Sequence, residues 1–355
     1  TGVLFFYIMS FIFPILNQWP ESYFISPAKF ISNGLDVFIL NFGTQIDYLK
    51  QVAFFFIMLP VKIGLQLSVS PYTWGFELTP FLITAYFIIM MLFASWCFLK
   101  FSKDVAIGII LFSIFIYFGL TNMPWLPLIL IYGLIGFKIG GLKLSLTIVV
   151  SFLFITFTGV LPQALLSIYL CGIAVIISFI LGSSLGIWAA HNDKVSAFMR
   201  PINDTMQTMP SFVILIPFVM FFGIGEFTAL LAIIAYAFVP AMRYTEHGLR
   251  NLPETVIEAA RMIGCSQTQL LWKVKIPLAM PVIMLGLNQT IMFGLAMLVI
   301  AALVGTTGLG QLIYIGLSKA DFGTGMISGV SIALIAIIFD RTTQAWRIKL
   351  EKKTQ

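Results

Sequence analysis

Charge is scarce in this sequence. Lysine, arginine, aspartate and glutamate make up only 10% of its 355 residues, whereas hydrophobic residues make up 60%. A soluble globular domain carries about a quarter charged residues, so this composition excludes that class. We predict an all-α, polytopic membrane protein, long enough for roughly ten or eleven helical spans of about twenty residues each.

Reactive and metal-binding side chains are also few. The cysteines, Cys97, Cys171 and Cys265, are far apart, and two of them lie inside apolar runs, which is typical of buried, inert thiols. The histidines, His191 and His247, have no metal-ligand neighbours in the sequence. No nucleophile, base and orienting residue occur together. We therefore predict no metal site and no catalytic residues, and a membrane-bound enzyme is a weak alternative.

Two further sequence signals are missing. No stretch fits Gly-x-x-x-x-Gly-Lys-Ser/Thr, so we find no loop of the kind that cradles nucleotide phosphates. The segment from Gly2 to Leu16 has neither a basic start nor a small-residue cleavage site, and we expect no signal peptide there. The energy for any transport by this chain must come from elsewhere.

Apolar runs divide the chain. We expect membrane helices near residues 52–69, 79–99, 105–120, 124–140, 143–158, 161–190, 207–223, 227–243, 281–304 and 325–340, with a polar break before 207 and a shorter apolar run at 3–16. Residues 28–50 have apolar positions at helical spacing, which predicts a helix lying in the membrane interface. A soluble loop helix packed on the protein fits that pattern equally well. We divide the chain into N-terminal transmembrane helices at 1–160, a transmembrane core at 161–345 and a tail at 346–355.

The basic residues are unevenly distributed between alternate connections. One set of connections holds Lys100, Lys103, Lys138, Lys143, Lys194, Arg200, Arg243, Arg250, Arg261, Lys273, Lys275, Arg341, Arg347, Lys349, Lys352 and Lys353. The alternate set holds only Lys319, and the remaining three lysines lie before residue 63. By the positive-inside rule the first set is cytoplasmic, and the C-terminus with it.

A polar segment at 253–281 separates two of the apolar runs. It opens with a proline and a glutamate, which is typical of a helix start, and Gly264 is typical of a helix end. We expect a second short helix from Ser266 or Gln267 that stops before Pro277, because the residue preceding a proline disfavours helical geometry. Each helix has one apolar face, so the segment suits a docking knob.

Polar side chains inside the apolar runs are the other informative class, because burying them is costly unless they are paired or line a pathway. One polar stretch opens the run at 207–223, and another lies about two turns into the run at 281–304. Either these residues line a translocation pathway or they join helix to helix, and aromatic residues nearby are candidates for cation-π contact with a passing cation. The candidate pathway residues are Gln207, Thr208, Met209, Pro210, Phe221, Phe222, Tyr236, Asn288, Gln289 and Thr290.

Three shorter features complete the pattern. Small residues at 182–186 favour close helix packing. The glycine-rich stretch at 305–311 is expected in an external loop, as a re-entrant turn or as a docking surface for an external partner. Asp340 and Arg341 close the last apolar run and are positioned to pair at the cytoplasmic interface.

Residues of the polar segment carry a resemblance to a known family. Glu258, Ala259, Ala260, Gly264, Val274, Ile276 and Pro277 together resemble the EAA loop of ATP-binding-cassette importer permeases. The stretches at 204–212, 215–217, 222–225, 277–281, 288–290, 308–311 and 340–344 look like the glycine betaine/proline betaine/choline branch of these permeases. The resemblance covers about residues 165–345, and the N-terminal part is similar only in being hydrophobic.

This resemblance implies a type I importer permease in the bacterial inner membrane, with a MetI-like core of about five helices plus extra N-terminal helices. It implies three kinds of partner: a second copy of the permease, two cytoplasmic ATPase subunits and a periplasmic or tethered substrate-binding protein. ATP and magnesium would belong to the ATPase, with no cofactor in this chain. The seven residues of the EAA pattern would form an elbow, within a cytoplasmic coupling loop at 245–280, that seats in a cleft of the ATPase. Nucleic acid is not an expected partner, whereas the lipid bilayer is.

The implied cargo is a small methylated amine such as glycine betaine, proline betaine, choline or trimethylamine N-oxide. An amino-acid importer permease of the methionine type also carries an EAA loop and is the first alternative. An ion-coupled secondary transporter is a less favoured alternative, because it would need acidic residues or a cation site within the membrane, and the apolar runs contain almost none.

Overall fold

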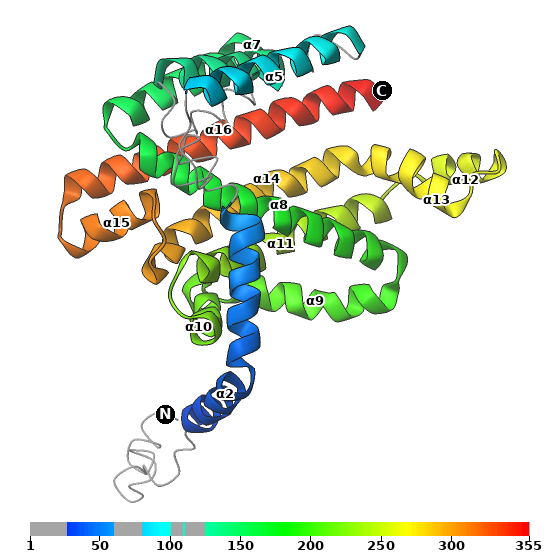
Figure 1. Cartoon of the computed structure of the whole chain (residues 1–355). Helices are drawn as coiled ribbons and strands as arrows, with labels where there is room; N and C mark the ends of the chain where they lie inside the picture. The colour runs from blue at the N-terminus through cyan, green and yellow to red at the C-terminus, as the bar shows by residue number, and fades with distance from the viewer. Residues whose placement is uncertain (1–26, 60–79, 101–108, 111–124, 355) are drawn as a thin grey trace, which may run out of the picture. The chain divides into compact units, whose positions relative to one another are not determined.

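The computed structural model describes residues 27–59, 80–100, 109–110 and 125–354. The elements in that part of the chain are helices, as predicted (Figure 1). They are α2 (Pro27–Ala53), a π-helix (Phe54–Met58), α5 (Pro80–Lys100), α7 (Trp125–Phe157), α8 (Leu161–His191), α9 (Asp193–Thr208), α10 (Ser211–Phe222), α11 (Glu226–Arg250), α12 (Glu254–Met262), α13 (Gln267–Gln269), a π-helix (Leu270–Lys275), α14 (Ile276–Ala301), a 3-10 helix (Ala302–Val304), α15 (Leu309–Ser318) and α16 (Phe322–Thr354). The expected runs at 3–16 and 105–120, and the second half of the run at 52–69, lie largely or wholly outside the described residues.

The chain forms two compact units, Thr1–Tyr48 and Leu49–Gln355. In the first unit, the described residues belong to α2, and the location of this helix in the membrane interface stays a prediction. Among the described residues of the second unit, five helices are long and apolar enough to cross a membrane: α7, α8, α11, the helix from Gln267 to Val304, and α16.

Helix α7 is a hairpin rather than a straight rod. Gly141 has φ +76° and ψ −165°, which breaks the helix in the middle. The two halves fold back on each other, because the Trp125 and Phe157 rings at the two ends lie 6.2 Å apart and Tyr132 stacks on Phe152 at 5.1 Å. The break falls between the expected runs at 124–140 and 143–158, so the prediction of two separate helices is confirmed.

Helices α8, α11 and α14 form the centre of the larger unit. Ala174 on α8, Ile233 on α11 and Met297 on α14 are fully buried in one apolar cluster. The α8–α11 contact is close because Gly182 and Gly186 face the backbone of α11: a Cβ at Gly182 would lie 2.5 Å from the Phe238 carbonyl oxygen. The predicted role of the small residues in helix packing is therefore confirmed.

The expected polar break before residue 207 forms a helix of its own. Residues 193–208 form α9, whose first turn is capped by the Asn192 side chain accepting from the amides of Lys194 and Val195. Helix α10 follows after Met209 and Pro210 at a bend of 104° to α9. The polar composition hid this helix, because its stability depends on packing against α11 rather than on an apolar run.

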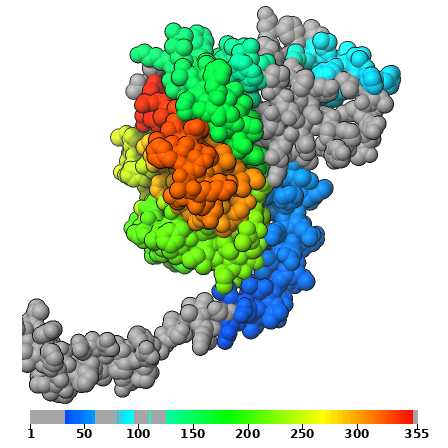
Figure 2. All heavy atoms as spheres, turned by 90° about the vertical axis from the view of Figure 1, so that its left-hand side faces the viewer, coloured from blue at the N-terminus to red at the C-terminus, as the bar shows by residue number. Residues whose placement is uncertain are grey.

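The glycine-rich stretch joins α14 to the short apolar helix α15. Gly305 has φ +80° at the end of the 3-10 helix, and Gly308 begins α15. Gly308 lies against α8, where the Leu309 amide donates to the Ser167 hydroxyl at 2.8 Å. Figure 2 views this end of the bundle, where α15 occupies the middle of the face. The following turn is closed by the Thr324 hydroxyl and amide, which donate to Asp321 and lower the pKa of its carboxyl.

Candidate functional site

The polar segment predicted as the coupling loop begins with α12 and a tight turn. The chain reverses at Gly264, which has φ +86°. The Gly264 amide donates to the Arg261 carbonyl at 2.9 Å and the Cys265 amide to the Ala260 carbonyl at 3.2 Å, the two bonds of a Schellman motif. Only glycine adopts this φ without cost, whereas a Cβ here would meet no atom of this chain within 4 Å. Backbone geometry is therefore the constraint that the structure places on Gly264.

The second part of the segment is the beginning of a long helix. Ser266 starts it with a capping box, in which the Ser266 side chain accepts from the Gln269 amide and the Gln269 side chain accepts from the Ser266 amide. The helix then continues through a π-helical turn into α14 and reaches Val304. We refer to residues 253–277 as the elbow.

The predicted helix end before Pro277 is thus wrong. The π-helical turn lies directly before this proline, and the Ile276 amide bonds to the Leu271 carbonyl, five residues back. Pro277 follows this turn directly, so the wider π-helical turn accommodates its ring inside the continuing helix.

The elbow exposes apolar side chains on an otherwise polar surface. Met262 is 89% exposed, Ile263 83% and Trp272 62%. Of the predicted coupling residues, Glu258, Ala259 and Gly264 are exposed, Ala260 is buried, and Val274, Ile276 and Pro277 are half-buried. Exposed apolar groups of this kind outside the spans typically mark a protein interaction surface.

The base of the elbow is anchored in the bundle. Leu270 is only 1% exposed, and a separate apolar cluster joins Leu249 at the end of α11 to Ala279 and Ile283 at the start of α14. The elbow is therefore an extension of the two helices that it connects. Figure 1 shows it at the same end of the bundle as the α8–α9 turn and the C-terminus.

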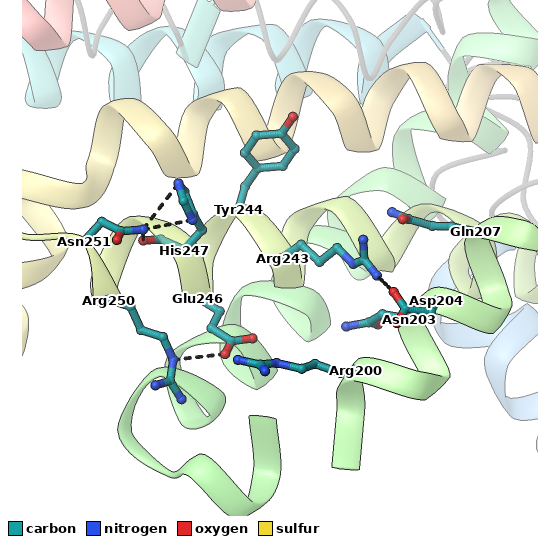
Figure 3. Close-up of a pocket in the computed structure, with 10 residues that line it drawn as sticks. All are labelled: Arg200, Asn203, Asp204, Gln207, Arg243, Tyr244, Glu246, His247, Arg250 and Asn251. Carbon is teal, nitrogen blue, oxygen red and sulfur yellow. Dashed lines mark hydrogen bonds and ion pairs between the residues drawn. The ribbon is translucent and has the colours of Figure 1, made fainter. Parts of the chain in front are cut away.

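Next to the elbow, α9 and α11 form a polar cleft of about 730 Å³. Figure 3 shows its charged and amide side chains projecting from the two helices. It is lined by Arg200, Asn203, Asp204, Gln207, Arg243, Tyr244, Glu246, His247, Arg250 and Asn251. Of the predicted pathway residues, only Gln207 lies in this lining.

Ion pairs hold the two walls of the cleft together. Arg243 on α11 pairs with Asp204 on α9. Arg250 pairs with Glu246 one turn earlier, at 3.0 Å, and with Asp193 at the start of α9, at 2.8 Å. The α11 end that enters the elbow is therefore fastened to α9 at both ends of the cleft.

Sequence reasoning missed this charged cluster. The basic residues were assigned to a cytoplasmic connection, and α11 was expected to end near residue 243, although it continues to Arg250. The spacing of four between Glu246 and Arg250 is a signal for that extension. The pairs to Asp193 and Asp204 join residues 57 and 39 positions apart, and no local pattern indicates them.

The remaining predicted pathway residues are scattered. Thr208, Met209 and Pro210 lie at the bend between α9 and α10, and Phe221 and Phe222 lie at the far end of α10. Tyr236 stacks on Phe293 of α14, with ring centroids 5.0 Å apart. Phe222 packs edge-on to Phe227, at 5.5 Å. The structure does not bring these residues together in one site with the 288–290 stretch, and their pathway role stays a prediction.

Asn288 joins α14 to α16, whereas Thr290 does not bridge two helices in the part of the chain that the structure describes. Asn288 donates to Asp340 of α16 at 2.9 Å and accepts from the Thr343 hydroxyl at 2.6 Å, while Gln344 donates to both Asp340 oxygens at 2.8 Å. Thr290 bonds back to its own helix, whereas Gln289 is half-buried. The predicted pair between Asp340 and Arg341 is not formed among the described residues. These contacts support the alternative in which the polar stretch joins helix to helix.

We expect Asn288→Leu to lower the thermal unfolding midpoint of the purified protein clearly more than Gln289→Leu on the next position of α14. The leucine removes the amide that donates to the Asp340 carboxylate and accepts from the Thr343 hydroxyl, so two contacts between α14 and α16 are lost at a cost of about 1 to 3 kcal/mol. Fluorescence-detected unfolding in detergent measures both variants. Equal shifts for the two would contradict a role of the Asn288 contacts in stability.

Comparison with known proteins identifies the family of this chain. Residues 178–344 match the family of binding-protein-dependent transport system inner membrane components. The glycine betaine transport system permease protein OpuAB of Bacillus subtilis is 36% identical over 266 residues, which are 74% of this chain and 94% of OpuAB. The chain belongs to this permease family. The all-α permease fold expected from the elbow residues is thereby confirmed.

Other relatives of the permease agree with this assignment. The glycine betaine/proline betaine transport system permease protein ProW of Escherichia coli K12 is 40% identical over 226 residues, 64% of either chain. The trimethylamine N-oxide transport system permease protein TmoV of Pelagibacter ubique is 42% identical over 226 residues, 63% of this chain and 31% of TmoV. The permease thus spans less than two thirds of ProW and about a third of TmoV.

Proposed function

We propose that this chain is the membrane-spanning subunit of an ATP-driven importer for a small methylated amine. Glycine betaine, proline betaine, choline and trimethylamine N-oxide are the candidate solutes. The observation that carries the proposal is the similarity to OpuAB over 94% of its length, together with an elbow that has the EAA residues and an exposed apolar tip.

The elbow supports the coupling part of the proposal. Its exposed Met262 and Ile263 would seat in a cleft of a cytoplasmic ATPase subunit, and closure of an ATPase pair would move α11 and α14 as rigid bodies. Two permease copies would face two ATPase subunits, which hold the ATP and magnesium. A periplasmic or tethered binding protein would deliver the solute at the opposite end of the bundle.

The position of the basic residues supports a cytoplasmic elbow and C-terminus. Lys349 near the end of α16 donates to the Lys138 carbonyl at the turn of the α7 hairpin, and Lys275 of the elbow lies 3.4 Å from His191 at the end of α8. Connections that are distant in sequence thus gather their basic residues at one end of the helices. By the positive-inside rule, this end faces the cytoplasm of the bacterial cell.

The alternatives are less well supported. A methionine-type importer would share the elbow, but the relatives described above carry names for betaines and trimethylamine N-oxide. An ion-coupled carrier would need an acidic cation site in the membrane. Asp340 is a half-buried acid in a candidate span, but its carboxylate oxygens are held by Asn288 and Gln344.

ATP hydrolysis by the assembled complex tests the proposed function. The permease is reconstituted in liposomes with its ATPase and binding-protein partners, and each of the four solutes is titrated. We expect at least one of them to stimulate hydrolysis, and uptake to stop on ATP depletion but to survive collapse of the proton and sodium gradients. An assembled, active complex that responds to none of the four would refute the assigned cargo.

A further inference from the structure

In the cleft between α9 and α11, one cationic side chain has no carboxylate partner among the described residues. Asp204 is paired with Arg243. Glu246, whose side chain is only 13% exposed, accepts from Arg250 and from the Ser196 hydroxyl at 2.6 Å. Both carboxylates of the lining are thus engaged, whereas Arg200 has no carboxylate within ion-pair distance among the described residues. The cleft therefore presents one unpaired guanidinium.

Figure 3 shows Arg200 reaching from α9 across the cleft towards α11, below Arg243 and beside Glu246. Its side chain is exposed to the cleft, so a solute can reach it. The buried Asn203 is its neighbour in the lining, and Asn203 Oδ1 has no hydrogen-bond partner. The residues that line the cleft have polar or charged side chains, in contrast to the apolar faces of the spans.

The chemistry of this group indicates what it would bind. A guanidinium has a planar fork of N–H donors that matches a carboxylate in a bidentate arrangement, and it stays charged at all relevant pH values. The candidate solutes differ in this respect: glycine betaine and proline betaine carry a carboxylate, whereas choline and trimethylamine N-oxide do not. Tyr244, the aromatic residue of the lining, points away from Arg200 towards α14 (Figure 3), so recognition rests on the carboxylate.

We infer that the α9–α11 cleft is a cytoplasmic binding site for a carboxylate-bearing betaine, with Arg200 as the residue that recognises the carboxylate. This inference rests on the proposed function for its choice of solute. Arg200 would then favour methylated amines that carry a carboxylate over methylated amines that do not. It also places solute contact on the helix α9 and next to the elbow, away from the Asn288 stretch.

Chemical protection of Arg200 tests the site directly. The purified permease is treated with the arginine reagent phenylglyoxal, and the adduct at Arg200 is followed by mass spectrometry, with the elbow residue Arg261, which is exposed in the permease alone, as an internal control. Glycine betaine at its dissociation constant is expected to slow modification of Arg200 about twofold, because half of the sites are then occupied, and to leave Arg261 unchanged. Choline, which has the same trimethylammonium group, is expected to protect neither residue.

Three results would overturn the inference. Arg200 reacting equally fast over a full titration with glycine betaine would show that no carboxylate binds there. Equal protection by choline would assign recognition to the ammonium group, and equal protection by acetate would indicate an unselective anion site. None of these results depends on ATP hydrolysis, so they are distinguishable from failure of the proposed function.

Uptake by variants provides the second readout. Arg200→Gln is expected to slow initial uptake of glycine betaine several-fold, and Arg200→Lys to restore part of it. Lys194→Gln removes one positive charge from the same helix outside the cleft and is expected to leave uptake unchanged. An equal loss in Arg200→Gln and Lys194→Gln would indicate a general charge effect and would contradict the assignment.

Discussion

Uptake by the assembled importer is expected to fall to background when Glu258 is replaced by lysine. Glu258 is exposed on α12, and it makes no hydrogen bond or ion pair with any other described residue. Lysine is a good helix former, so the substitution leaves the elbow folded. If the elbow seats in the ATPase, reversal of a charge inside that contact costs about 2 to 5 kcal/mol, which is more than a tenfold loss of coupling.

The measurement compares solute uptake in cells with the amount of permease in the membrane. Basal ATP hydrolysis by the reconstituted complex is expected to persist without stimulation by the loaded binding protein. Glu258→Gln, which removes the charge but keeps the shape, is expected to be milder. Gly264→Trp is a second route to the same loss, because it forces a bulky residue into φ +86°. Normal uptake by both Glu258→Lys and Gly264→Trp would rule out this segment as the coupling element.

The largest loss of stability is expected for Gly186→Val in α8. A Cβ at this position would lie 2.6 Å from the Met242 carbonyl oxygen and 2.8 Å from the Thr245 Cβ. The obstacle includes the α11 backbone, which cannot rotate away as a side chain can. Helices α8 and α11 must therefore separate, at a cost of about 3 kcal/mol or more.

Gly172→Val on the same helix is the matched control. It introduces the same β-branched residue, yet a Cβ at Gly172 would meet nothing within 4 Å. Both variants carry the same cost of placing valine in a helix, so this cost cancels in the comparison. The difference between their thermal unfolding midpoints then reports the contact with α11. A similar midpoint for both variants would contradict the close α8–α11 approach.

Features that depend on neighbouring residues were predictable from the sequence. The start of α12 at Glu254, the turn at Gly264 and the cap at Ser266 are as expected, because each rests on one residue and its immediate backbone. The break at Gly141 was also predictable, because it falls in the gap between two expected apolar runs. Pro277 misled the prediction because the π-helical turn before it removes the usual conflict.

Features that depend on distant residues were not predictable. The sequence marks Asn288 as a buried amide, but nothing in it indicates Asp340 as the partner, 52 positions away. The polar sequence of α9 gives no clear helix signal by itself, because the helix depends on its contacts with α11. The cleft was missed for the same reason, because each of its charges alone is typical of a solvated connection. Arg200 becomes informative only when the partners of its neighbours are known.

The long helix that follows the elbow makes the connection asymmetric. From Gln267 to Val304 the backbone is one continuous helix of 38 residues, about 55 Å at the usual rise per residue. On the other side, a turn at residues 251–253 separates α11 from α12. A push on the elbow would therefore rotate α14 as a stiff lever arm, whereas the turn lets α11 lag behind. The two helices would then shear past each other.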